Sequence, residues 1–349
     1  MENLLEQRQK RFRVTGVVLF VSALGLLLCR ILARLLPSGM SELGKDAVFS
    51  VSIQVVFLLI VPFLIYKFAL KKSVRGTLEF SNFRKVDWKI ALLCIPLGAC
   101  VLVITSGVST AWAIFIKALG YSPSASTGTI GPFNPLELLI NIALTAVLPA
   151  FCEEFTNRGG LLTTMRGSFS SRTTIVLVGV YFGLFHQNIT QFLYPMFFGM
   201  LMAWLTLRTK SVYPAMIIHF VNNALSVYLD YAQIYPILPF HDFVISMEVL
   251  TLNYFPVVVM MYFIVFAVAV ALCWLIAKRV RRNSFIIRNS VSIGGITILA
   301  VEGEEVDGEE KSLADKKLYK PVLRDWAFYI GALVITFLAT IASFVWGVL

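Results

Sequence analysis

The segment from Val147 to Leu162, VLPAFCEEFTNRGGLL, places two adjacent carboxylates and an arginine at the end of an apolar run. Starting at Pro135, that run is long enough to cross a bilayer as a helix. Ionisable side chains at membrane depth each cost about 2.5 to 3.5 kcal/mol on insertion scales, and they usually mark a functional site or a paired interior. The segment therefore predicts a membrane helix that carries polar groups into the interior of a bundle.

The composition of the whole chain favours the same fold class. Its 349 residues are 58% hydrophobic and only 14% charged, whereas soluble domains carry about 25% charged residues. The net charge of +10 comes from short basic clusters between apolar runs, which is the pattern of cytoplasmic loops. No aromatic and basic surface suited to stacking bases accompanies them. We therefore expect membrane lipid around the protein and no nucleic-acid partner.

Hydropathy predicts an all-α polytopic membrane protein, a bundle of about eight to nine transmembrane helices. The boundary between the fifth and sixth spans is the least defined, because these two spans are short and nearly continuous. The nine predicted spans are Val14–Leu36, Ala47–Tyr66, Ile90–Ile116, Pro135–Thr156, Thr173–Gln187, Gln191–Leu207, Val212–Tyr231, Leu250–Ala277 and Trp326–Val348.

The basic residues of the loops predict the orientation of the bundle. Clusters precede the first span and follow the second, fourth, sixth and eighth, so all of them fall on one side of the membrane. The loop around His241, Asp242 and Glu248 on the other side has no basic residue. By the positive-inside rule, the N-terminus is cytoplasmic and the C-terminus lies outside. We expect a multi-pass protein of the cell membrane.

The pattern of spans and loops divides the chain into five parts. Residues 1–134 hold three N-terminal spans, residues 135–231 form a predicted catalytic core, and residues 232–277 hold an outer loop and the eighth span. Residues 278–325 form a polar cytoplasmic loop that contains a strand-like segment, SVSIGGITILAVEG, and an acidic run. A small hairpin, a solvated linker and a partner-binding tail all remain open for this loop. Residues 326–349 form the last helix.

Three polar groups lie inside the predicted spans. Glu154 and Arg158 are four residues apart, so they share a helix face and can neutralise each other, while Glu153 lies about 100° away around the helix. His186 occupies an apolar stretch, and His219 shares a helix face with Asn223. Each group alone has an ordinary structural explanation: a wetted helix end, a packed histidine, or a polar contact between helices.

Together these groups favour a catalytic explanation. The chain has three histidines, two of which lie in spans close to the double glutamate. If the three spans converge on one pocket, a carboxylate and an imidazole can bind a water molecule and accept its proton. A second imidazole and an amide can then donate hydrogen bonds to the oxyanion that forms. The chemistry that fits such a pocket is hydrolysis.

The motifs E-E-x-x-x-R-G, F-x-x-x-H and H-x-x-x-N, in this order on predicted membrane helices, resemble those of the CAAX protease and bacteriocin-processing family of intramembrane proteases. The resemblance extends over residues 146–226 and includes the connecting residues Gly199, Arg208, Thr209, Ser211 and Pro214. It implies that Glu153 and His186 activate water. It also implies that His219 and Asn223 stabilise the oxyanion, and that Glu154 and Arg158 support the first helix. The polar loop at residues 278–325 and the final span lie outside the family pattern.

The resemblance implies an intramembrane endopeptidase that acts on a membrane-associated peptide or protein. CAAX-type proteins and the maturation of, or immunity to, peptide toxins are the two substrate themes of the family. We expect no cofactor, although two histidines and a glutamate also form a possible zinc site with an open position. The alternatives are a transporter or proton-coupled channel, in which buried Glu, Arg and His form a relay, and an inactive scaffold of the same fold. The substrate and the oligomeric state do not follow from the sequence.

Overall fold

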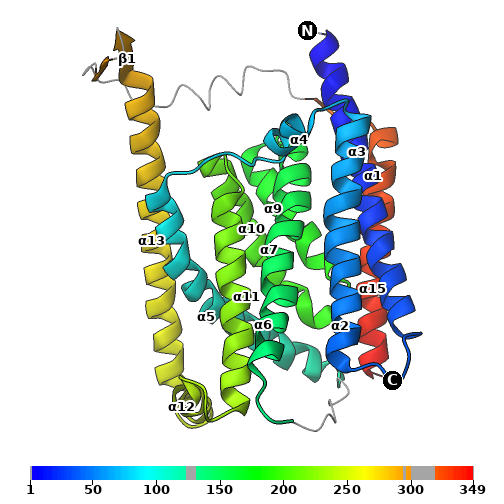
Figure 1. The fold of residues 1–349 in the computed structure, drawn as a ribbon, viewed down its shortest axis with the longest axis vertical. Helices are drawn as coiled ribbons and strands as arrows, with labels where there is room; N and C mark the ends of the chain where they lie inside the picture. The colour runs from blue at the N-terminus through cyan, green and yellow to red at the C-terminus, as the bar shows by residue number, and fades with distance from the viewer. Residues whose placement is uncertain (1, 123–130, 294–295, 300–318, 349) are drawn as a thin grey trace.

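The computed structural model describes residues 2–122, 131–293, 296–299 and 319–348, and these residues form a helical bundle with one short hairpin (Figure 1). In the first part of the chain, one long helix is followed by a second rod that contains a π-helical segment, by a short helix at the upper end and by a long oblique helix. These elements are α1 (Glu2–Ala33), α2 (Glu42–Val51), η1 (Ser52–Ile60), α3 (Val61–Ala69), α4 (Val74–Phe80) and α5 (Trp88–Ala118).

A continuous helical rod from Pro135 to Met165 forms the centre of the bundle and contains two π-helical segments. Its parts are α6 (Pro135–Ile142), η2 (Ala143–Val147), α7 (Leu148–Glu154), η3 (Phe155–Leu161) and α8 (Leu162–Met165). It is followed by α9 (Ser171–Phe185), the single 3₁₀ turn η4 (Ile189–Gln191), α10 (Leu193–Thr209) and α11 (Tyr213–Ile234). Residues far apart in sequence can meet around this rod, because α10 and α11 contact each other as well as α5.

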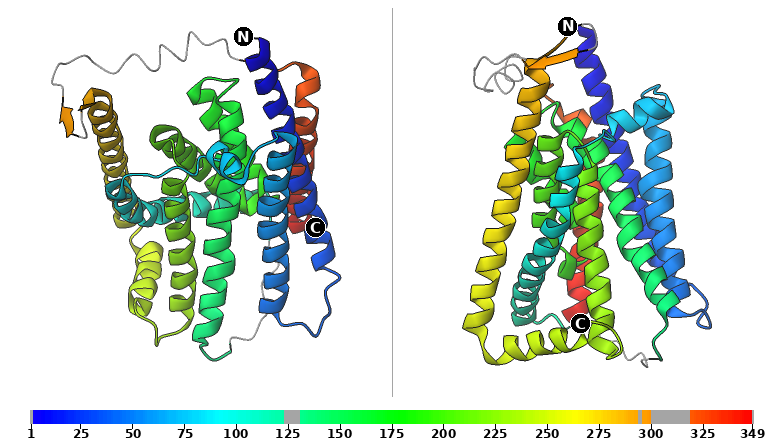
Figure 2. Two further views of the ribbon diagram at one scale, coloured as in Figure 1. Left: turned by 45° about the horizontal axis from the view of Figure 1, so that its top comes forward. Right: turned by 60° about the vertical axis from the view of Figure 1, so that its left-hand side comes forward.

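The last part of the chain lies at the edge of the bundle and beside its beginning. Helix α12 (His241–Asn253) lies across the lower end of the bundle and leads into α13 (Phe255–Asn289), as Figure 2 shows. Two antiparallel strands, β1 (Ser290–Ile293) and β2 (Ile296–Leu299), pair with Ser290 opposite Leu299. The final helix, α15 (Leu323–Val348), packs along α1.

The predicted all-α polytopic fold is confirmed. Each of the nine predicted spans overlaps a helix in the described part of the chain, and seven of these helices are long and apolar enough to cross a membrane. The fourth helix extends to Met165, beyond the predicted end at Thr156. The predicted eighth span begins too early, because the chain leaves helical geometry at Tyr254 between α12 and α13.

Two of the nine helices fall outside the set of seven for different reasons. Helix α9 has 15 residues, because Gln187 adopts a left-handed backbone conformation with φ of 49° and turns the chain back within the bundle. Helix α11 has 22 residues, but His219, Asn222 and Asn223 lower its hydropathy. The predicted boundary between the fifth and sixth spans therefore corresponds to a turn that contains η4.

The polar loop predicted for residues 278–325 is partly helical. Helix α13 continues to Asn289, and within the strand-like sequence residues 290–293 pair with residues 296–299 as antiparallel strands. The acidic run at residues 302–310 lies outside the described residues.

Close contact between α9 and α10 depends on glycines that face the partner helix. A Cβ atom added to Gly179 would lie 2.7 Å from the carbonyl oxygen of Met196, and one added to Gly183 would lie 2.5 Å from that of Phe192. Heavy side chains at these positions would push the two helices apart, since backbone atoms cannot move aside as a flexible side chain can. This close approach fixes the end of α9, where His186 lies.

Candidate active site

Glu154 lies on the face of the central rod that is buried against α10 and α11. Its Oε2 atom is 3.1 Å from Nε of Arg158, one turn later, and its Oε1 atom is 2.9 Å from Nδ1 of His219. Glu154 and Arg158 have no exposed side-chain surface. The pair predicted from the four-residue spacing is therefore present, and it also holds the histidine of α11.

Arg158 has further contacts within the protein interior. Its guanidinium carbon is 4.4 Å from the centre of the Phe182 ring, and Nη2 donates a hydrogen bond of 3.4 Å to the carbonyl oxygen of Gly199. A cation over an aromatic face is attracted by the ring quadrupole, and more strongly where water is excluded. Arg158 thus connects the central rod to α9 and α10.

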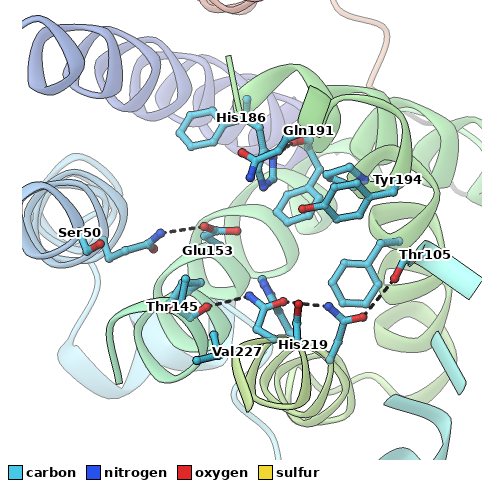
Figure 3. A pocket seen from close by; sticks show the side chains of 18 of the residues that line it. Ser50, Thr105, Thr145, Glu153, His186, Gln191, Tyr194, His219 and Val227 are labelled. Carbon is cyan, nitrogen blue, oxygen red and sulfur yellow. Dashed lines mark hydrogen bonds between the residues drawn. The ribbon is translucent and has the colours of Figure 1, made fainter. Parts of the chain in front are cut away.

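Glu153 points away from this pair and into a cavity of the bundle (Figure 3). Its Oε1 atom accepts a hydrogen bond of 2.8 Å from the side-chain amide of Gln54, which belongs to the π-helical segment η1. Glu153 is 8% exposed, and no ion pair with it is present among the described residues. It is the freer of the two carboxylates, as the helical geometry predicted.

His186 lies at the end of α9, where the chain turns back. Its Nδ1 atom is 2.8 Å from the carbonyl oxygen of Phe182. Since a carbonyl only accepts, Nδ1 carries the proton and Nε2 of the neutral ring keeps its lone pair. The backbone around His186 is held from three sides: Arg30 donates to the carbonyl of His186, Trp112 to that of Ile189, and the Ile189 amide to Ser343.

A chain of amide hydrogen bonds positions the polar face of α11. Asn223 donates to the carbonyl of Thr145 at 2.9 Å, and its side-chain oxygen accepts from Asn222 at 2.9 Å. Asn222 in turn accepts from the Thr105 hydroxyl at 3.4 Å. These contacts, visible in Figure 3, fix the Asn223 amide between the central rod and α5.

One cavity of about 640 Å³ joins these groups. Glu153, His186, His219 and Asn223 all line it, whereas Glu154 and Arg158 lie behind His219 and support it from the interior. Among the lining residues Glu153 and His219 are buried, whereas Thr110, Thr145, Gln191 and Asp230 are exposed. The cavity therefore combines a buried polar part with lining residues that are open to the surroundings of the protein.

The residues in this cavity do not form a metal site with three or more ligands. Within the described part of the chain, no three side chains of His, Cys, Asp or Glu type gather closely enough to hold a metal ion. His219 directs Nδ1 at Glu154 and His186 directs Nδ1 at a backbone carbonyl. The zinc alternative considered from the sequence thus has no three-ligand set in this geometry.

The polar cavity residues that were not predicted from the sequence include two that contact the predicted ones. Gln54 and Arg30 are isolated polar residues inside the second and first predicted spans. Their position within apolar runs is the signal that would have identified them, since polar residues at membrane depth are rare. Neither residue belongs to a motif, and both are far from the two glutamates in the sequence.

Comparison with known proteins supports the resemblance inferred from the motifs. Residues 135–225 match the family model described as type II CAAX prenyl endopeptidase Rce1-like, and the predicted relation to the CAAX protease family is confirmed. Neither curated proteins nor solved structures give a match. The matched segment contains all six residues singled out from the motifs. The described chain has seven helices that are long and apolar enough to cross a membrane, and the protein is an integral, multi-pass membrane protein.

Proposed function

We propose that the cavity is the active site of an intramembrane endopeptidase of the CAAX type. The observation that carries the proposal is the convergence of Glu153, His186 and His219, from three different helices, on one cavity. The family match supports a peptidase in general. A water molecule between a carboxylate and an imidazole is the nucleophile that such a site requires.

Glu153 and His186 are the proposed activators of that water. Both side chains face the cavity, and Nε2 of the neutral His186 ring is free to accept a proton. The Gln54 amide occupies one oxygen of Glu153 and thereby orients the other oxygen for contact with water. General-base catalysis of this kind contributes about 10² to 10⁴ in rate.

His219 and Asn223 are the proposed donors to the oxyanion of the tetrahedral intermediate. Because Glu154 pairs with Arg158 and accepts from His219, Nδ1 of His219 carries a proton. Nε2 donates to an oxyanion only when the ring is doubly protonated, and the charge of that ring is then stabilised by the oxyanion itself and by the adjacent Glu154 carboxylate, which it shares with Arg158. Asn223 uses one amide hydrogen for Thr145 and retains a second for the oxyanion.

The proposed substrate is a membrane-associated peptide or protein. Such a substrate is a CAAX-type protein, or a peptide undergoing maturation or conferring immunity, that reaches the cavity from the membrane or its surface. The prenyl or other lipid anchor stays in the bilayer while the peptide reaches Glu153.

The test uses the purified full-length protein in lipid nanodiscs and an S-prenylated CAAX-type peptide. Replacement of Glu153 by Gln removes the proton acceptor but preserves size and hydrogen bonding, so kcat should fall by about 10² to 10⁴. His241→Ala is the matched control, because His241 caps the turn between α11 and α12 and does not line the cavity. Full activity of Glu153→Gln would refute the proposed role. In cells, peptides whose ends change between wild type and Glu153→Gln would identify the substrate.

A further inference from the structure

Arg30 is a cation on the wall of the same cavity. It lies in the last turn of α1 and contacts the turn that carries His186, through a hydrogen bond of 2.6 Å from Nη2 to the His186 carbonyl. Its Nε atom is buried and has no hydrogen-bond partner, and none of the carboxylates in the described residues forms an ion pair with it. The guanidinium has five N–H donors, so most of its binding capacity is unused.

Two other arginines are paired with carboxylates of the protein, one of them fully buried and the other partly exposed. Arg158 is paired with Glu154, and Arg13 is paired with Asp325 at 2.6 Å. A desolvated cation is costly unless an anion lies beside it. Arg30 differs from these two because no carboxylate in the described part of the chain is paired with it. Its guanidinium lies on the cavity wall and, among those residues, donates only to the backbone carbonyl of His186. The charge at this position is therefore available to an anionic group that enters the cavity.

We propose that Arg30 binds a carboxylate of the substrate. The planar guanidinium matches a carboxylate in a two-point contact and is well suited to sites of low polarity. This inference rests on the proposed peptidase function. It adds a recognition site that selects substrates by an acidic group next to the bond that is hydrolysed.

The position of Arg30 limits where that carboxylate lies along the substrate. Arg30 touches the backbone of His186, and the imidazole of the same residue lines the reaction cavity. An extended peptide advances about 3.4 Å per residue, so the bound carboxylate lies only a few residues from the hydrolysed bond. Its source is either the free end of the substrate chain or an acidic side chain close to the bond.

The experiment compares two S-prenylated CAAX-type peptides that differ only in ending as a free acid or as a carboxamide. A charged hydrogen bond lost from the bound state lowers kcat/KM by about tenfold to a hundredfold, and the wild-type protein should prefer the acid by that factor. In Arg30→Gln the ratio of kcat/KM for acid over amide should fall to about one. Arg30→Lys should retain part of it.

Arg34→Gln is the matched control, because Arg34 lies one turn further along, over the Trp346 ring, and does not line the cavity. It should keep the wild-type ratio. A second pair of amidated peptides, with Glu or Gln as the last residue, identifies an acidic side chain as the source: discrimination of this pair, lost in Arg30→Gln, supports the same site.

Two results would overturn the inference. One is a wild-type protein that discriminates neither pair of peptides. The other is an acid preference that survives in Arg30→Gln, since Arg30 would then only hold the His186 turn. Binding of the peptides to Glu153→Gln protein separates this inference from the proposed function. If the peptides bind with a preference for the acid that depends on Arg30, but the wild type hydrolyses neither of them, the carboxylate site at Arg30 is supported and the proposed peptidase function is refuted.

Discussion

At the scale of single residues, the pair formed by Glu154 and Arg158 concentrates two opposite charges in a region without exposed surface. Each partner has a different second contact. The Glu154 carboxylate accepts a hydrogen bond from His219, and the Arg158 guanidinium lies over the Phe182 ring. Removal of one partner leaves the other charge without compensation, and this is more costly than the pair itself is stabilising.

A double-mutant cycle on this pair gives the first stability prediction. Glu154→Gln and Arg158→Met should each destabilise the folded protein by about 3 to 5 kcal/mol. The double variant should be less destabilised than the sum of the two, since it leaves no unpaired charge. Thermal unfolding in detergent measures all three. Additive losses would mean that the two side chains do not act as a unit.

Helical spacing was sufficient to predict this pair, because residues four apart lie on one face of an α-helix. It was also sufficient to separate Glu153 from Glu154. The contact between Glu154 and His219 was not predictable in the same way, since it joins residues 65 positions apart and depends on how α11 packs. Gln54 and Arg30 were missed for a similar reason: they are single polar residues whose partners lie on other helices.

At the scale of elements, the short helix α9 and its partner α10 position His186. Gly183 lies one residue from Phe182 and against the carbonyl of Phe192. A side chain here has no room, so the two helices must separate or the His186 turn must move.

Gly183→Ala should therefore lower peptidase activity and destabilise the protein by about 1 to 3 kcal/mol, the usual cost of overpacking. Gly39→Ala is the control, because a Cβ atom at Gly39 would meet nothing within 4 Å. Unfolding midpoints and peptide hydrolysis report on the two effects. If Gly183→Ala behaves like Gly39→Ala, the contact between α9 and α10 is not tight in solution.

Asp87 connects the start of α5 to α13 outside the membrane-spanning segments. Hydrogen bonds from Asn283, from the backbone of Lys89 and from Arg279 lower the pKa of Asp87 from 3.8 to about 2. The ordinary value applies to the unfolded chain, so Asp87 stabilises the fold above about pH 4, and this contribution is lost as the pH falls towards 2.

The corresponding experiment compares the unfolding of the wild type with that of Asp87→Asn between pH 2 and pH 7. The difference in stability should be constant above about pH 5 and should shrink as the pH drops below 4. A difference that grew towards low pH would show that Asp87 is not the group being titrated.

The boundaries of the elements were less predictable than their existence. The break at Tyr254 is followed by Pro256, the second residue of α13, and proline favours the first turn of a helix. The predicted eighth span rested on hydropathy and did not use this signal. The left-handed turn at Gln187 is stabilised by contacts from α1, α5 and α15. Local sequence does not contain these contacts, so the predicted spans were accurate in the middle and approximate at their ends.

At the scale of the whole molecule, the two chain ends lie at opposite ends of the bundle in Figure 1. The positive-inside rule predicts a cytoplasmic N-terminus and an external C-terminus. Cysteines introduced at Gln7 and at Val348, which is exposed, in a background without the five native cysteines, should react with a membrane-impermeant thiol reagent from opposite sides of sealed vesicles. Labelling of both from the same side would contradict the predicted topology.

The contact between the first and last helices also has a consequence for biosynthesis. Phe12 packs against Trp326 and accepts a hydrogen bond from Tyr329, while Arg13 pairs with Asp325. These contacts join residues more than 300 positions apart in the sequence. Helix α1 is therefore synthesised long before α15, and it lacks this neighbour for nearly all of translation. A chain that ends before Leu323 leaves the face of α1 that packs on α15 uncovered, with Arg13 unpaired from Asp325. We expect the quality-control machinery of the membrane to recognise that face.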